Sequence, residues 1–139
     1  MTTVTEMRGR IGAVRFLALL FGQLPTDREY TADSDKWSSA LLRLRDRHVE
    51  LEDLFDELTF SKKPGCKPYS PEVSKFLIRL RAGTVVQVVN SGLVRLQISS
   101  EIQKEMYEFH AKKVDSGILP IVRQLADELA KDNDVIVIR

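Results

Sequence analysis

The chain has 139 residues, of which 43% are hydrophobic and 29% are charged, and this combination indicates one folded globular domain and excludes a disordered chain. The formal net charge is +1, so any surface that binds polyanions must arise from the local distribution of charge. A single cysteine, Cys66, excludes an internal disulfide framework and a cysteine-rich metal site, and it favours a reducing, cytoplasmic location.

The first predicted element is a helix over residues 7–24, where apolar residues recur at helical spacing around most of the circumference. Such a helix is typically central in its domain or covered by a partner. Its longest apolar stretch, 16–21, is much shorter than the roughly 20 residues of a membrane span. Arg15 also interrupts the apolar run that a signal peptide would need, so no membrane partner is expected.

Residues 26–36 have no periodicity and are expected to form a polar linker. A long helix is predicted over 37–60, where apolar positions alternate at gaps of four and three, as in a coiled-coil seam. Two uses of this seam remain open: self-association with an antiparallel second copy, or packing inside the chain against the first and last helices. The seam consists of Trp37, Leu41, Leu44, His48, Leu51, Phe55 and Leu58.

A short helix is predicted after a loop over residues 61–69. Its first residues are Ser70, Pro71 and Glu72, because serine caps a helix, proline fits the first helical position and glutamate is favoured at the positive end. Gly83 ends the helix. Its predicted buried face consists of Val73, Phe76, Leu77 and Leu80.

Two segments rich in β-branched residues, 84–89 and 93–98, are predicted to be the strands of a hairpin. Asn90, Ser91 and Gly92 between them suit a three-residue loop in which the glycine takes the left-handed conformation. Helical periodicity then resumes and continues almost to the end of the chain. The predicted fold class is therefore mainly α, in the α+β sense, with a single domain over 1–139.

The C-terminal part is predicted to be a helical extension over about residues 100–131. Ser100 and Gln103 have the spacing of a capping box at the start of this extension. Gly117 and Pro120 interrupt it, and a further helix follows. Residues 135–138 are predicted to form a short terminal strand.

The capped helix, the glycine after it and the hairpin resemble the centre of a winged-helix domain, and the resemblance covers about residues 37–98. Small prokaryotic regulators and phage-associated proteins often contain such a unit. In winged-helix proteins that bind DNA, the short helix enters the major groove and the hairpin lies beside it. The resemblance therefore implies that the outer surface of the short helix contacts DNA. That surface would consist of Ser74, Lys75, Ile78, Arg79 and Arg81.

The distribution of charge supports the same function. Seven basic residues and one acidic residue, Glu72, lie between positions 62 and 95, which gives this segment a charge of +6 in a chain of +1. A local positive surface is what neutralisation of phosphates requires. The predicted nucleic-acid-binding residues are Ser74, Lys75, Arg79 and Arg81 on the helix, with Lys62, Lys63, Lys67 and Arg95 at the backbone.

The expected function is that of a DNA-binding regulator or accessory factor that binds double-stranded DNA without a cofactor. The alternative is a non-enzymatic interaction subunit of a larger assembly, with its interface on the long helix. An enzyme is the least favoured class, because the sequence has no glycine-rich phosphate loop, nucleophile elbow or metal-ligand spacing. Cys66 is interpreted as an incidental loop thiol and His48 as a neutral, packed histidine.

Overall fold

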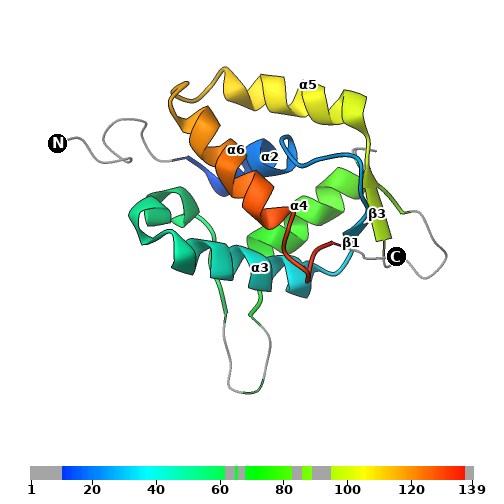
Figure 1. The fold of residues 1–139 in the computed structure, drawn as a ribbon, viewed down its shortest axis with the longest axis horizontal. Helices are drawn as coiled ribbons and strands as arrows, with labels where there is room; N and C mark the ends of the chain where they lie inside the picture. The colour runs from blue at the N-terminus through cyan, green and yellow to red at the C-terminus, as the bar shows by residue number, and fades with distance from the viewer. Residues whose placement is uncertain (1–10, 62–64, 66–67, 83–85, 89–94, 137–139) are drawn as a thin grey trace.

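A computed structural model describes residues 11–61, 65, 68–82, 86–88 and 95–136 (Figure 1). The fold is mainly helical, as predicted. In chain order its elements are α2 (Ala13–Phe21), β1 (Tyr30–Thr31), α3 (Ser34–Arg47), the 3-10 helix η1 (Val49–Phe55), α4 (Pro71–Ala82), β2 (Val86–Val88), β3 (Arg95–Ile98), α5 (Ser100–Ala111) and α6 (Ile118–Leu129).

Helix α2 lies at the centre of the fold, which confirms the prediction made from its apolar circumference. Every residue from Phe16 to Phe21 is buried, and the helix packs against α4, α5, α6 and η1. In Figure 1, α5 and α3 lie on opposite sides of α2. The helix begins at Ala13, and residues 7–10 of the predicted helix lie outside the described part of the chain. Burial on all sides removes nearly the whole apolar circumference of α2 from water, which is the dominant stabilising contribution of such a helix.

Two residues of the segment predicted as a polar linker belong to the buried interior. Tyr30 and Thr31 form β1 and are both buried, and α3 begins soon afterwards, at Ser34. The Tyr30 hydroxyl donates a hydrogen bond to the Pro25 carbonyl at 2.6 Å. The prediction of a polar linker is therefore wrong at Tyr30 and Thr31, because two residues are too few to produce the alternating pattern by which a strand is predicted.

The long helix predicted over 37–60 is broken, and that prediction is also wrong. Helix α3 ends at Arg47, His48 has non-helical backbone angles (φ −124°, ψ 65°), and η1 follows. A straight helix over 37–60 would be roughly 36 Å long and would carry its last turns away from the core. The break returns the chain to α2, where the Phe55 ring packs edge-on against Phe16 at 4.9 Å between centroids.

The residues of the predicted coiled-coil seam pack against other parts of the same chain. Of the two predicted uses of the seam, self-association and packing inside the chain, this is the second. Five of its seven members are buried among the core residues, and the other two are half-buried. The buried members are Trp37, Leu41, Leu44, Phe55 and Leu58, and the half-buried ones are His48 and Leu51.

Three short antiparallel strands form one sheet in the order β1-β3-β2. The predicted hairpin pairs Val86 with Ile98 and Val88 with Leu96, while its predicted turn at 90–92 lies outside the described residues. Strand β1 pairs with the other edge of β3, with Tyr30 opposite Leu96.

The predicted terminal strand reaches the sheet at one bridge within the described residues. Ile136 bridges to Tyr30, and the Thr31 amide donates to the Val135 carbonyl at 2.8 Å. Residues 137–139 lie outside the described part of the chain. The segment at 135–136 is therefore fixed beside β1.

The predicted capping box at the start of α5 is not formed. Gln103 is buried and its side-chain amide donates to the carbonyls of Phe21 and Leu24, at 2.6 and 2.9 Å. The last carbonyls of a helix have no partner within that helix. The Phe21 carbonyl accepts one long hydrogen bond from the Leu24 amide, at 3.3 Å, and Gln103 adds a shorter one to it and another to the Leu24 carbonyl. Gly22 allows this close packing, because a Cβ atom there would lie 2.8 Å from the Cβ of Tyr107.

Candidate nucleic-acid interface

Helix α4 has one buried and one exposed face, and the buried face is the predicted one. Val73, Phe76, Leu77 and Leu80 are all at most 4% exposed. The Phe76 ring packs against Phe21 at 5.2 Å between centroids, which fixes α4 against the central helix. Rotation of α4 about its axis would expose this apolar row, so the opposite face is held outward.

The outward face presents Lys75, Ile78 and Arg79, all of them exposed, with Ser74 half-buried beside them. Residues three and four positions apart are neighbours on a helix surface, so these side chains form one continuous patch. We call Lys75, Ile78 and Arg79 the α4 patch. Within the described part of the chain, neither of its two cations forms a salt bridge.

The N-terminus of α4 is anchored to α3. The Ser70 hydroxyl accepts a long hydrogen bond of 3.4 Å from the Val73 amide, which is the predicted cap. The Ser70 amide donates to the Ser38 hydroxyl of α3 at 3.1 Å, and both serines are buried. Just before this cap, Ser61 and Tyr69 pair as an antiparallel bridge. The α4 patch is therefore carried by a rigidly placed helix.

Glu72, the one acidic residue of α4, is hydrogen-bonded to residues at and before the start of the helix. Its carboxylate accepts hydrogen bonds from the Thr59 amide at 2.6 Å, the Thr59 hydroxyl at 2.8 Å and the Ser70 hydroxyl at 3.2 Å. Partial burial acts to raise the pKa of this carboxyl, but the hydrogen bonds from Thr59 and Ser70 outweigh it and lower the pKa below its ordinary value.

Replacement of Glu72 by glutamine is expected to lower the free energy of unfolding by about 1 kcal/mol at pH 7. Because the pKa of the native carboxyl is lowered, its stabilising contribution is complete above the unfolded-state pKa, near 4.3, and is lost as the pH falls through the native value. Urea unfolding at pH 7 and at pH 3 is the measurement.

The difference between wild type and Glu72→Gln should shrink at the lower pH. Glu105→Gln, at an exposed position on α5, is the matched control and should change stability little at either pH. If Glu72→Gln lowered the free energy of unfolding equally at both pH values, the assignment of these hydrogen bonds to the ionised carboxylate would be contradicted.

The other predicted binding residues are described in part or not at all. Lys62, Lys63 and Lys67 lie outside the described residues. The backbones of Arg81 and Arg95 belong to α4 and β3, whereas their side chains lie outside the described part. The structure therefore brings together Ser74, Lys75 and Arg79 from the predicted set.

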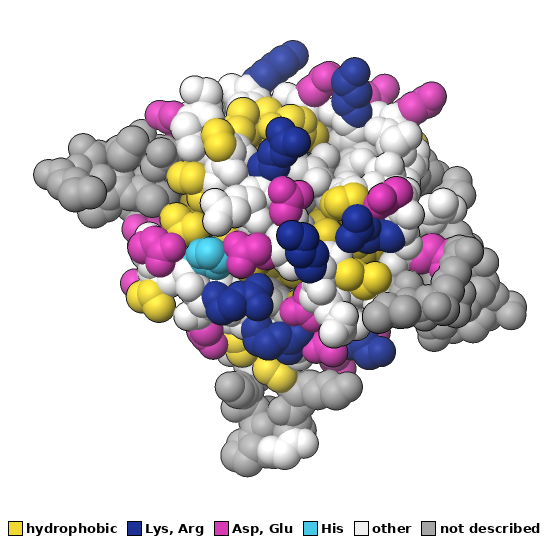
Figure 2. Space-filling model, in the orientation of Figure 1, with side chains coloured by type: hydrophobic (Ala, Val, Ile, Leu, Met, Phe, Trp, Pro, Cys, Tyr) yellow, Lys and Arg dark blue, Asp and Glu magenta, His cyan; other side chains and the backbone are white. Residues whose placement is uncertain are grey.

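Several cations of α3 differ from those of α4 because they are paired with carboxylates. Arg43 bonds Asp132 at 2.9 Å and Asp134 at 2.7 Å. His48 lies between Glu128, 2.7 Å from its Nε2 atom, and Glu50, 3.4 Å from its Nδ1 atom. Figure 2 shows basic and acidic side chains interspersed on the face formed by α3 and α6. Because positive and negative charges alternate on this surface, it attracts polyanions less than the α4 patch, whose charged side chains are both positive.

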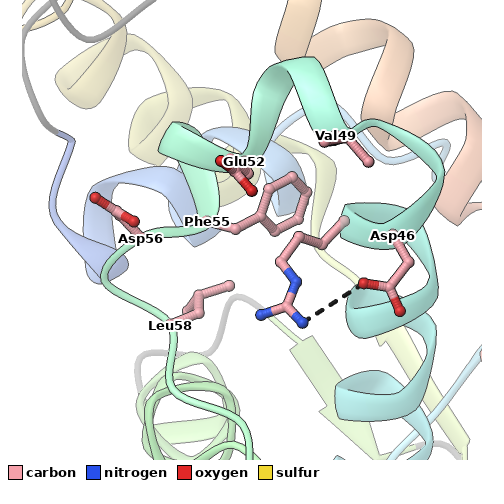
Figure 3. Close-up of a pocket in the computed structure, with 7 residues that line it drawn as sticks. Asp46, Val49, Glu52, Phe55, Asp56 and Leu58 are labelled. Carbon is pink, nitrogen blue, oxygen red and sulfur yellow. Dashed lines mark hydrogen bonds and ion pairs between the residues drawn. The ribbon is translucent and has the colours of Figure 1, made fainter.

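A pocket of about 440 Å³ lies where α3 meets η1 (Figure 3). Phe55 and Leu58 provide its apolar lining, and the carboxylates of Asp46, Glu52 and Asp56 surround it. The Arg45 guanidinium in this pocket lies 3.5 Å from Asp46 and over the Phe60 ring, 5.2 Å from its centroid. Three carboxylates around one arginine make this pocket unsuited to phosphate.

A metal site and a membrane span were looked for among the described residues. Among them, no group of three or more histidine, cysteine, aspartate or glutamate side chains is arranged to hold a metal ion. In the same part of the chain, no helix combines the length and apolarity needed to cross a membrane. Comparisons with protein-family models, curated proteins and solved structures returned no match to this chain. The function is therefore inferred from the described side chains themselves.

Proposed function

We propose that this protein is a DNA-binding regulator or accessory factor that binds double-stranded DNA through the α4 patch. The observation that carries the proposal is the pair of exposed cations, Lys75 and Arg79, on a helix whose one acid, Glu72, is held by Thr59 and Ser70. Lysine and arginine donate to phosphate oxygens, and arginine also forms bidentate hydrogen bonds with guanine in the major groove.

The order of the elements supports a winged-helix arrangement. A helix, a short strand, the helices α3, η1 and α4, and a hairpin follow one another, and the first strand lies on the edge of the hairpin. In this comparison α4 takes the position of the helix that enters the major groove. The connection between α3 and α4, residues 48–70, is longer than the three- to four-residue turn of a helix-turn-helix motif, and it contributes η1 to the core.

The dimensions of α4 suit this role. The major groove of B-DNA is about 12 Å wide and admits one α-helix with its side chains. The helix has 12 residues, so it extends over roughly 18 Å and places its outward face along several base pairs. Because the opposite face is packed on α2, binding would not require α4 to leave the core.

The alternative function, an interaction subunit, requires an exposed apolar strip on the predicted long helix or on the first helix, in which Phe16 to Phe21 are all buried. Trp37, Leu41 and Leu44 are instead at most 1% exposed within the chain itself. This burial does not favour the alternative, and DNA binding remains the function that the described side chains support best.

The direct test is a titration of a labelled duplex of about 24 base pairs with the purified full chain, followed by fluorescence anisotropy. Binding is expected at about 50 mM salt and should weaken steeply by about 200 mM, because each phosphate contact releases counterions. The slope of log Kd against log salt reports the number of contacts. Absence of binding at the lower salt concentration would overturn the proposal.

A further inference from the structure

An apolar side chain lies beside the two cations of the α4 patch. Ile78 is 60% exposed, although the buried face of the same helix is almost completely closed to water. It is three positions after Lys75 and is therefore its neighbour on the helix surface, while Arg79 lies about 100° further around the helix. A surface that bound phosphates alone would gain nothing from an isoleucine at this position, because phosphate offers no apolar group to contact.

We propose that Ile78 contacts the C5 methyl group of thymine in the major groove and gives the protein a preference for thymine-containing duplexes. This inference rests on the proposed function. The thymine methyl is the apolar group that the bases present on the edge of that groove. The isoleucine side chain makes no hydrogen bond, so it can recognise a base directly only by contact with this methyl group.

The spacing of the patch agrees with this assignment. Lys75 and Arg79 are one helical turn apart, about 6 Å along the axis, which corresponds to roughly two base-pair steps. Along the axis Ile78 lies between them, and around the helix it is about 60° from Lys75 on the same outward side. When the two cations hold phosphates or guanine edges, the isoleucine is held against the base pairs between them.

The proposal can be tested with two self-complementary duplexes of the same length, alternating dA-dT and alternating dA-dU. They present identical hydrogen-bonding groups and differ in the thymine methyl groups. The wild-type chain is expected to bind the dA-dT duplex about four- to fifteenfold more tightly, the range that burial of one or two methyl groups gives. Salt concentration is kept equal in the two titrations.

Two substitutions assign the preference to the residue. Ile78→Ser should bind both duplexes with the affinity that wild type shows for dA-dU, whereas Ile78→Val should keep most of the preference. Both variants should fold as wild type does, since position 78 is exposed, and far-UV circular dichroism verifies this.

The outcomes separate this inference from the proposed function. Salt-dependent binding of both duplexes with equal affinity would overturn the role of Ile78 and leave DNA binding in place. A preference that persists in Ile78→Ser would also overturn it, because another group would then read the methyl. Failure to bind either duplex would overturn the proposed function, and with it the inference.

Discussion

Replacing Trp37 with alanine is expected to lower the free energy of unfolding by about 3–5 kcal/mol, the range for removing a buried aromatic side chain. Trp37 is 1% exposed, and its ring packs against Phe21 and Tyr30 at 4.7 and 5.7 Å between centroids. It therefore joins the start of α3 to α2 and to the edge strand of the sheet. A domain of this size has a total stability of about 5–15 kcal/mol, so the variant should be marginal.

Part of this loss comes from one hydrogen bond. The Trp37 indole N–H donates to the Thr31 carbonyl at 2.8 Å in the buried interior, and alanine would leave that carbonyl without its partner. Trp37→Phe removes the hydrogen bond but keeps most of the ring packing, and it should cost about 1–3 kcal/mol. The difference between the two variants separates packing from hydrogen bonding.

Urea unfolding followed by far-UV circular dichroism is the appropriate measurement. Trp37 is the one tryptophan of the chain, so its replacement removes the tryptophan fluorescence signal. Circular dichroism reports the helices of wild type and of both variants alike, and the three unfolding curves can therefore be compared directly. A loss below about 1 kcal/mol for Trp37→Ala would contradict the central position of this ring.

The elements that the sequence predicted well are those specified by local chemistry. Helix α4 begins at Pro71 after the Ser70 cap, and its apolar spacing identified the four buried residues. The hairpin was predicted from β-branched residues, and α2 from an apolar circumference. In each case the signal is contained within about ten residues, which is the range over which periodicity and capping operate.

The elements that were missed depend on contacts between distant parts of the chain. The heptad seam continues through His48 without a glycine or proline, yet the chain breaks there so that Phe55 can pack on Phe16. Gln103 has the spacing of a capping box but donates to carbonyls about 80 residues away, at the end of α2. At both positions, contacts with distant residues override the local structural preference, and such contacts cannot be predicted from a local sequence pattern.

The candidate site was predictable in part for the same reason. Helical spacing is enough to assign Lys75 and Arg79 to the outward face of α4. Spacing does not reveal which cations are neutralised by distant acids, as Arg43 is by Asp132 and Asp134. Within the described residues, that pairing distinguishes Arg43 of α3 from the two cations of the α4 patch, and it makes α4 the face on which charge reversal should matter most.

Reversing both charges of the α4 patch, Lys75→Glu with Arg79→Glu, is expected to weaken binding of duplex DNA by about 100-fold or more at low salt. Each lost contact costs about 1–3 kcal/mol, and each introduced carboxylate adds repulsion from phosphate. Stability should change little, because both positions are exposed. The dependence of log Kd on log salt should become shallower by about two contacts.

The matched control is Lys104→Glu with Arg123→Glu, at exposed positions on α5 and α6. Both double variants have the same net charge, so a loss of affinity that reflected bulk charge alone would be equal in the two. Since screening limits the effect of distant charges to about one Debye length, near 10 Å at 0.1 M salt, the control is expected to lose far less affinity. Equal losses would show that the positive character of the whole molecule, and not the face of α4, attracts DNA.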